Sequence, residues 1–176
     1  MSRVSRGLNT VKNLWKENHG ASAVEFAIVL PLLLILVFGM IEFGLIIYDQ
    51  QVITNASREG ARFAINAEGK SGSSVQTVIS TYCNPDNNPN KSRLISFGTN
   101  SPPTTVVKNA STLNDLSSAA NVCAGAISAN PIDIKVQVSY NYHFLVFHNI
   151  AQLFNSSQSS TINLSTFTVM RCEVTS

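Results

Sequence analysis

An uninterrupted apolar run from Phe26 to Tyr48 constrains this chain more than any other feature, because Glu42 is its one residue that is neither apolar nor small. An α-helix of about 23 residues is about 35 Å long, enough to cross a hydrocarbon core of about 30 Å. A cleaved secretory signal is a poor match, since its apolar part has only about 7–15 residues. Pro31 lies within the run, and membrane helices tolerate such a proline. The run therefore predicts a membrane anchor that stays on the protein.

The charges that flank the run predict its orientation. Residues 1–19 have a net charge of +3, from four basic residues and one acid (Arg3, Arg6, Lys12, Lys16 and Glu17). The first basic residue after the run is Arg58. Because basic residues remain on the cytoplasmic side, we expect a cytoplasmic N-terminus and an external segment 49–176. Tyr48 suits the outer interface, while Trp15 either suits the inner one or lies exposed in a leader.

The segment His19–Phe26 joins the basic leader to the apolar run. It consists of a histidine and a glycine, then four small or apolar residues, an acid and an aromatic residue. This pattern resembles the processing site of type IV prepilins, which is cut after the glycine and has glutamate at the fifth mature position. The aromatic Phe26, together with Ile41–Gly44 and Ser57–Arg62, makes the chain similar to the TadE-like proteins of the Flp/Tad (tight adherence) pilus system. The resemblance covers residues 20 to about 65.

The resemblance implies a bacterial inner-membrane protein that a prepilin peptidase cleaves after Gly20, leaving Ala21 as the new N-terminus. Gly20, Ala21, Glu25 and Phe26 would form the processing site. Glycine suits the scissile bond because it has no Cβ and a low helix propensity, which gives the peptidase an unwound approach. Removal of residues 1–20 changes the total side-chain charge to −1, from 8 basic and 9 acidic residues. Other pilins, pseudopilins, assembly proteins and membrane lipid are the implied partners.

Two acids within or beside the apolar run need an explanation, because an isolated carboxylate in hydrocarbon is costly. For Glu25 the resemblance implies pairing with the α-amino group of Ala21, from the same or an adjacent subunit, which would set the register between packed helices. The alternative is a solvated carboxylate at the headgroup level. Glu42 lies 17 residues later and on another helix face. It either reaches water near the outer interface or pairs with a neighbouring subunit or an assembly protein.

The outer part predicts a small α+β domain. The helix should continue from the membrane to about residue 67, and a short helix with apolar residues from Val75 to Tyr82 should follow, capped by Ser73 or Ser74. Residues 104–107 suit a short strand, whereas 110–127 suit either a helix or a loop. Strict alternation over Pro131–His143 predicts a half-buried antiparallel strand, and residues 161–172 predict a second one.

We expect the chain to divide into three segments: a leader at 1–20, a long helix at 21–67 with a span at about 26–48, and a domain at 68–176. The expected architecture is a long transmembrane helix that continues into a pilin-like domain with a two- to three-stranded antiparallel sheet.

Three cysteines lie in the outer part, where disulfides persist (Cys83, Cys123 and Cys172). Three pairings are possible, and the sequence does not choose among them. We favour Cys83–Cys123, because Cys172 lies in a strand pattern that would bury it.

Composition excludes several classes of function. Charged residues make up 12% of the chain against a usual share of about 25%, and the net charge of +2 is too small for a nucleic-acid-binding surface. No hydrolase, zinc-protease, P-loop or dinucleotide motif is present, and the spacing of His143 and His148 does not suit a helical metal pair. Beyond residue 70 there are four carboxylates (Asp86, Asp115, Asp133 and Glu173). We expect no enzyme, no catalytic residue, no metal and no cofactor.

The sequence thus favours a TadE-like minor pilin or pseudopilin that acts in pilus assembly and surface adherence. A TadF-like protein or a secretion-system pseudopilin is the nearest alternative. An uncleaved, single-span binding module with a chance leader resemblance is the alternative from another class.

Overall fold

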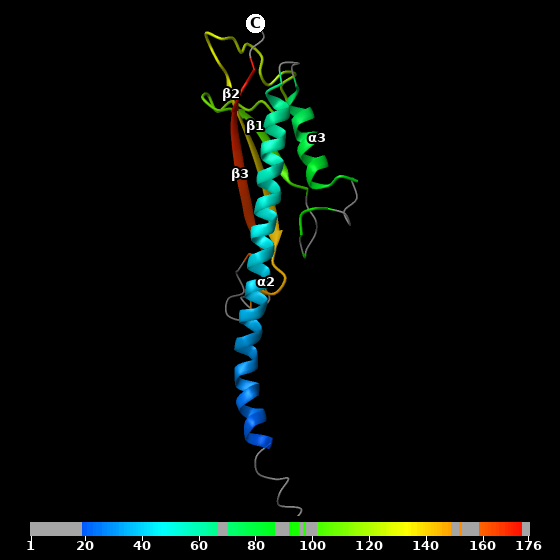
Figure 1. Cartoon of the computed structure of the whole chain (residues 1–176), viewed down its shortest axis with the longest axis vertical. Helices are drawn as coiled ribbons and strands as arrows, with labels where there is room; N and C mark the ends of the chain where they lie inside the picture. Colours follow the sequence, from blue (N-terminus) through cyan, green and yellow to red (C-terminus); the bar gives the residue numbers. More distant parts are fainter. Residues whose placement is uncertain are drawn as a thin grey trace, which may run out of the picture. The chain divides into compact units, whose positions relative to one another are not determined.

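The computed structural model describes residues 19–66, 70–86, 92–95, 97, 102–148, 152 and 159–173 of the 176-residue chain. Its elements follow in the order α2 (His19–Ala64), α3 (Gly72–Cys83), β1 (Thr104–Asn109), β2 (Asp133–His143) and β3 (Thr161–Arg171) (Figure 1). The chain divides into two compact units, one ending at Ile41 and the other beginning at Glu42. The predicted α+β class, with a long apolar helix and a small antiparallel sheet, is confirmed.

The described part of the first unit is helical throughout. Helix α2 begins at His19, two residues before the predicted start at residue 21, and it continues through Pro31 without a break, as predicted. Its length and composition suit a single membrane-spanning segment. Residues 1–18, which include the basic leader and Trp15, lie outside the described residues.

The second unit is built around a sheet with the strand order β1-β2-β3, in which both pairs are antiparallel. The alternation in the central strand has the expected consequence, because every second residue of β2 is buried against the helices (Ile134, Val136, Val138, Tyr140 and Tyr142). Residues 161–171 form β3, and the short predicted strand extends over Thr104–Asn109.

The second half of α2 packs on this sheet through small and β-branched residues. The buried set on its inner face contains Val52, Ile53, Ala56, Ala61 and Ala64. The buried Ser57 hydroxyl donates to the Val136 carbonyl at 2.9 Å and lies 3.0 Å from the Thr168 hydroxyl. The helix ends at Ala64, three residues earlier than predicted, and residues 67–69 are outside the described part.

Helix α3 begins earlier than the sequence predicted. Its N-cap is Ser71 rather than Ser73 or Ser74, and the Ser71 hydroxyl accepts the backbone N–H of Ser74 at 3.1 Å. Gly72 permits this start, because a Cβ there would clash with the backbone oxygens of Leu116 and Ser117.

Residues 110–127 are turns and isolated bridges rather than a helix. This segment closes the outer edge of β1, since the Leu116 N–H donates to the Val107 carbonyl at 2.7 Å. Residues 110–127 are therefore a loop and not a helix, because their backbone forms hydrogen bonds with the edge strand β1.

Candidate functional site

The predicted processing residues lie together at the start of α2. Gly20, Ala21, Glu25 and Phe26 are all exposed. Among the described residues, no atom other than those of its chain neighbours and the adjacent helix backbone comes within 4 Å of the position that a Cβ of Gly20 would occupy. Gly20 lies within the first helical turn rather than in an unwound approach, so a peptidase would have to open that turn. The low helix propensity of glycine reduces the free-energy cost of opening it.

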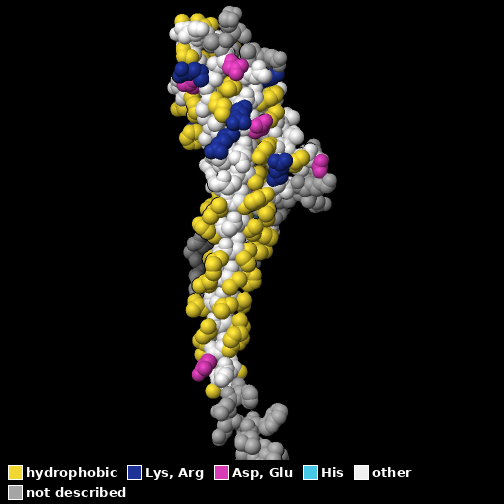
Figure 2. Space-filling view, in the orientation of Figure 1, with side chains coloured by type: hydrophobic (Ala, Val, Ile, Leu, Met, Phe, Trp, Pro, Cys, Tyr) yellow, Lys and Arg dark blue, Asp and Glu magenta, His cyan; other side chains and the backbone are white. Residues whose placement is uncertain are grey.

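After this junction, α2 presents a helical surface that is bulky, apolar and exposed. Phe26 is 62% exposed, Ile28 73% and Leu32 69%. Glu25 is the only charged residue between Gly20 and Ile41. Hydrophobic side chains cover this part of the helix in Figure 2. A surface of this kind requires an apolar surrounding, either lipid or other helices.

Glu42 has a role that neither sequence interpretation anticipated. The residue is only 2% exposed, and its carboxylate accepts two backbone N–H groups of the same chain. The N–H of Leu145 lies 2.5 Å from Oε1 and that of Phe147 lies 3.2 Å from Oε2. The predicted contact of Glu42 with water is wrong, because the segment after β2 folds over this carboxylate and donates to both oxygens. Pairing with a neighbouring subunit or an assembly protein stays a prediction.

Asp49, which the sequence interpretation missed, is a second buried acid on the same face of α2. It follows Glu42 by seven residues, which is two helical turns, and it is fully buried. Oδ1 accepts the Ile95 N–H at 2.9 Å, whereas Oδ2 has no hydrogen-bond partner. Burial raises the pKa of Asp49 to about 6, and the bond from Ile95 opposes this shift. The i, i+7 spacing of the two acids, in line with the buried Val52, Ile53 and Ala56, was the sequence signal for a packed face.

The segment Ser57–Arg62, which carried part of the family resemblance, is explained by packing. Gly60 lies under α3, because a Cβ added there would be 2.5 Å from Cδ1 and 2.6 Å from Cγ1 of Ile79. Arg58 and Arg62 point away from this contact and are exposed. The small residues of the segment therefore permit close approach of α3 and the sheet, and the charged residues face outward.

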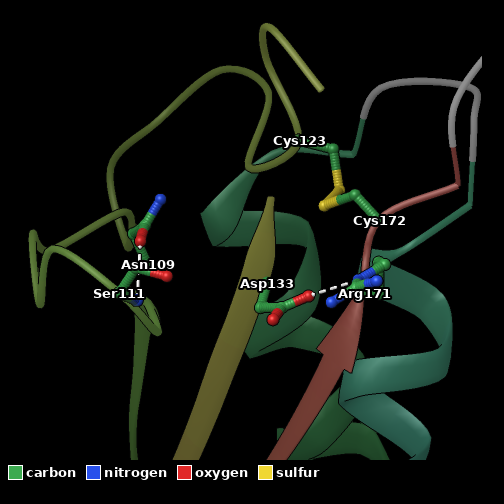
Figure 3. Close-up of polar contacts among 6 residues, drawn as sticks. All are labelled: Asn109, Ser111, Cys123, Asp133, Arg171 and Cys172. Atoms are coloured by element: carbon green, nitrogen blue, oxygen red, sulfur yellow. Dashed lines mark hydrogen bonds and ion pairs between the residues drawn. A yellow bond between two sulfur atoms is a disulfide. The ribbon is translucent and has the colours of Figure 1, made fainter. Parts of the chain in front are cut away.

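The disulfide joins Cys123 to Cys172, so the favoured pairing Cys83–Cys123 is wrong (Figure 3). Cys123 and Cys172 both lie at the C-terminal end of α2. The Cys123 Sγ atom is 3.4 Å from the Ala64 carbonyl oxygen, and the residue after Cys172 donates its N–H to the Ile65 carbonyl.

Cys83 is the last residue of α3, about 16 Å from the start of that helix. It is a free, buried core residue. Burial raises the pKa of the Cys83 thiol to about 11, so it is an inert thiol rather than a nucleophile.

The remaining carboxylates and histidines show no catalytic arrangement in the part of the chain that the structure describes. Asp133 pairs with Arg171 at 2.9 Å, which lowers the pKa of Asp133 (Figure 3). Asp115 accepts the backbone N–H of Ser117 at 2.8 Å. Within the same ranges, no three His, Cys, Asp or Glu side chains are placed to hold a metal ion.

Comparison with known proteins supports one family. The family model described as TadE-like protein matches residues 20–62, which is 43 of the 176 residues. No curated protein and no solved structure matches the chain significantly. The TadE-like family is in general non-enzymatic. The matched region begins at Gly20 and ends at Arg62. It therefore contains the predicted processing site, the exposed apolar part of α2, Glu42, and Gly60, which packs against α3. The match confirms the resemblance and supports a TadE-like protein of the Tad pilus system.

Proposed function

We propose that this chain is a minor pilin or pseudopilin of a Tad-type pilus machine, and not an enzyme. It is inserted in the bacterial inner membrane with its N-terminus in the cytoplasm and is cut after Gly20 by a prepilin peptidase. Its partners are other pilin-like proteins and the membrane proteins of pilus assembly. Its role is to help assemble, prime or tip a pilus that attaches the cell to a surface.

The observation that carries this proposal is the helix from Gly20 to Ile41. Its side chains are exposed and apolar, and its only charge is Glu25, five residues after the glycine. A membrane anchor alone would need the apolar residues but neither the glycine nor the acid at this spacing. Cleavage after Gly20 would place a new α-amino group within one helical turn of the Glu25 carboxylate. That pairing, within a subunit or between subunits, would neutralise both charges and fix the register of packed helices.

Cleavage is tested by the mass of the protein extracted from membranes of cells that contain the cognate peptidase. The wild type should begin at Ala21, twenty residues shorter than the translated chain. Gly20→Val should remain uncut, because a β-branched residue crowds the scissile bond and resists local unwinding.

Gly44→Val is the matched control, since Gly44 is also an α2 glycine whose Cβ position has open space around it beyond the adjacent helix backbone. It should be cut as the wild type is. Retention of residues 1–20 in the wild-type protein would contradict the proposal and favour an uncleaved, single-span binding module.

A further inference from the structure

The segment that follows β2 carries exposed apolar side chains. We call residues 144–148 the β2–β3 connector. Leu145 is 39% exposed and Phe147 is 41% exposed. The connector is fixed at its base, because the Phe144 N–H donates to the Ser160 carbonyl at 3.1 Å and the Phe144 ring meets that of Tyr142 edge-on at 5.8 Å.

Glu42 determines the level on α2 at which the connector lies. The two N–H groups that bond to the Glu42 carboxylate belong to Leu145 and Phe147, which are the exposed apolar residues of the connector. Their backbones therefore lie beside Glu42, and their side chains extend from that point.

The outer limit of the membrane is indicated by the exposed face of α2. This face is apolar at Phe43 and Ile47, which are 64% and 47% exposed, and Tyr48 is 46% exposed. From Gln51 onward the exposed residues of α2 are mostly polar or charged (Gln51, Asn55, Arg58, Glu59 and Arg62). A tyrosine at an apolar-to-polar change is typical of the membrane interface. The change lies about 9 Å beyond Glu42 at 1.5 Å per residue, so Glu42 is on the membrane side of it.

Helix length gives the same position independently. A hydrocarbon core of about 30 Å spans about 20 helical residues. A span that begins between Ala21 and Phe26 therefore ends between Ile41 and Ile46. Glu42 therefore lies within about 6 Å of the outer end of the hydrocarbon core in either case.

We propose that the β2–β3 connector is a second membrane contact, in which Leu145 and Phe147 insert into the boundary between headgroups and acyl chains. The Glu42 carboxylate makes this possible. Backbone N–H groups at that depth need an acceptor that lipid tails do not supply, and a carboxylate there needs donors. The Glu42 carboxylate and the two connector N–H groups therefore satisfy each other by hydrogen bonding. The proposal rests on membrane anchoring by α2, which is part of the proposed function, but not on cleavage after Gly20.

Tryptophan fluorescence in lipid vesicles tests the contact. Trp15 is the only tryptophan, so Trp15→Phe provides a background without one. In the full chain, Phe147→Trp should lose fluorescence to lipids brominated near the headgroup, to an extent comparable with Tyr48→Trp. Phe167→Trp is the matched control, because Phe167 is 60% exposed but packs beneath the Lys135 ammonium at 4.2 Å on the outer face of the sheet. It should show little quenching.

Equal quenching of Phe147→Trp and Phe167→Trp, with strong quenching of Tyr48→Trp, would overturn the connector contact alone. Absence of quenching at Tyr48→Trp would instead overturn the membrane anchor, and with it the proposed function. Glu42→Ala in the Phe147→Trp protein should reduce the quenching at residue 147, while the same change in the Tyr48→Trp protein should not alter it. Unchanged quenching at residue 147 would show that Glu42 does not hold the connector in the bilayer.

Discussion

The two halves of helix α2 differ in almost every respect except their secondary structure. From Gly20 to Ile41 the side chains are mostly apolar and exposed, and no residue in this range is buried. From Glu42 to Ala64 the buried face consists mainly of small and β-branched residues, and its exposed face becomes polar after Tyr48. The two halves of one continuous helix thus have opposite patterns of burial.

The difference indicates what each half of the helix is suited to contact. A helix that packs within its own chain needs small residues where a neighbour approaches, as at Gly60 against Ile79. A helix that faces lipid or other membrane helices needs apolar bulk over its whole surface. The boundary between the halves coincides with Glu42, where the domain first covers the helix.

The largest expected effect is at Glu25, the lone charge of the first half. Glu25→Ala should still insert in the membrane, because the apolar run and the leader charges are unchanged and a costly acid is removed. It should fail to enter pili, since the α-amino group of Ala21 would remain without a counter-charge where helices pack. Loss of one partner from a buried pair commonly costs about 3–5 kcal/mol. Complementation of a strain that lacks the gene, with pili counted by electron microscopy, measures this loss.

Two variants sharpen that comparison. Glu25→Asp should be intermediate, because the charge remains and the side chain is one methylene shorter. Glu59→Ala removes an exposed acid from the second half of the same helix and should assemble normally. If Glu25→Ala complements as well as Glu59→Ala, then Glu25 is merely a solvated residue at the membrane surface.

The next largest effect concerns the disulfide that closes the end of the domain. Cys123 and Cys172 are 49 residues apart, and on the chain-entropy model a loop of that length stabilises the folded state by about 4 kcal/mol. Cys172→Ala should lower the free energy of unfolding of the detergent-solubilised protein by roughly this amount. A reductant should destabilise the wild type and Cys83→Ala but not Cys172→Ala. Non-reducing peptide mapping that recovered a bridge to Cys83 would contradict the assignment.

The sequence predicted the elements of this fold better than it predicted their contacts. The alternation of β2, the continuous apolar run of α2 and the helical spacing of α3 are all local patterns, which a single chain displays directly. The pairing of Cys172, the N-cap at Ser71 and the donors to Glu42 depend on segments more than 40 residues away or on close backbone approach. Glu42 illustrates the limit, since its partners lie 103 and 105 residues along the chain and contribute backbone groups, which have no sequence signature.

The buried acid Asp49 predicts a pH dependence. Its pKa is about 6 in the folded protein against 3.8 for the unconstrained group. Between these values the unfolded chain has lost the proton and the folded chain retains it, so the contribution of Asp49 to stability falls as the pH rises from about 4 to 6. Asp49→Asn keeps an acceptor for the Ile95 N–H and removes the charge. It should raise the free energy of unfolding at pH 7 by at most about 3 kcal/mol.

The difference between Asp49→Asn and the wild type, followed by chemical denaturation from pH 4 to 7, isolates this group from the other carboxylates. The two proteins should have similar stability near pH 4 and diverge as the pH rises. A difference that is independent of pH would show that Asp49 is already ionised throughout this range.

The smallest effect compares two glycines of α2 directly. At Gly60 an added methyl group meets the Ile79 side chain, and overpacking of this kind costs about 1–3 kcal/mol. Part of that cost is offset, because alanine favours a helix over glycine by about 1 kcal/mol. Gly60→Ala should therefore lower the free energy of unfolding by about 1 kcal/mol. Gly44→Ala gains the same helix propensity and has open space around the new methyl group, so it should be neutral or stabilising. Thermal unfolding in detergent measures both, and a Gly60→Ala protein as stable as Gly44→Ala would mean that Ile79 moves aside at no cost and that the close contact of α2 with α3 does not require glycine.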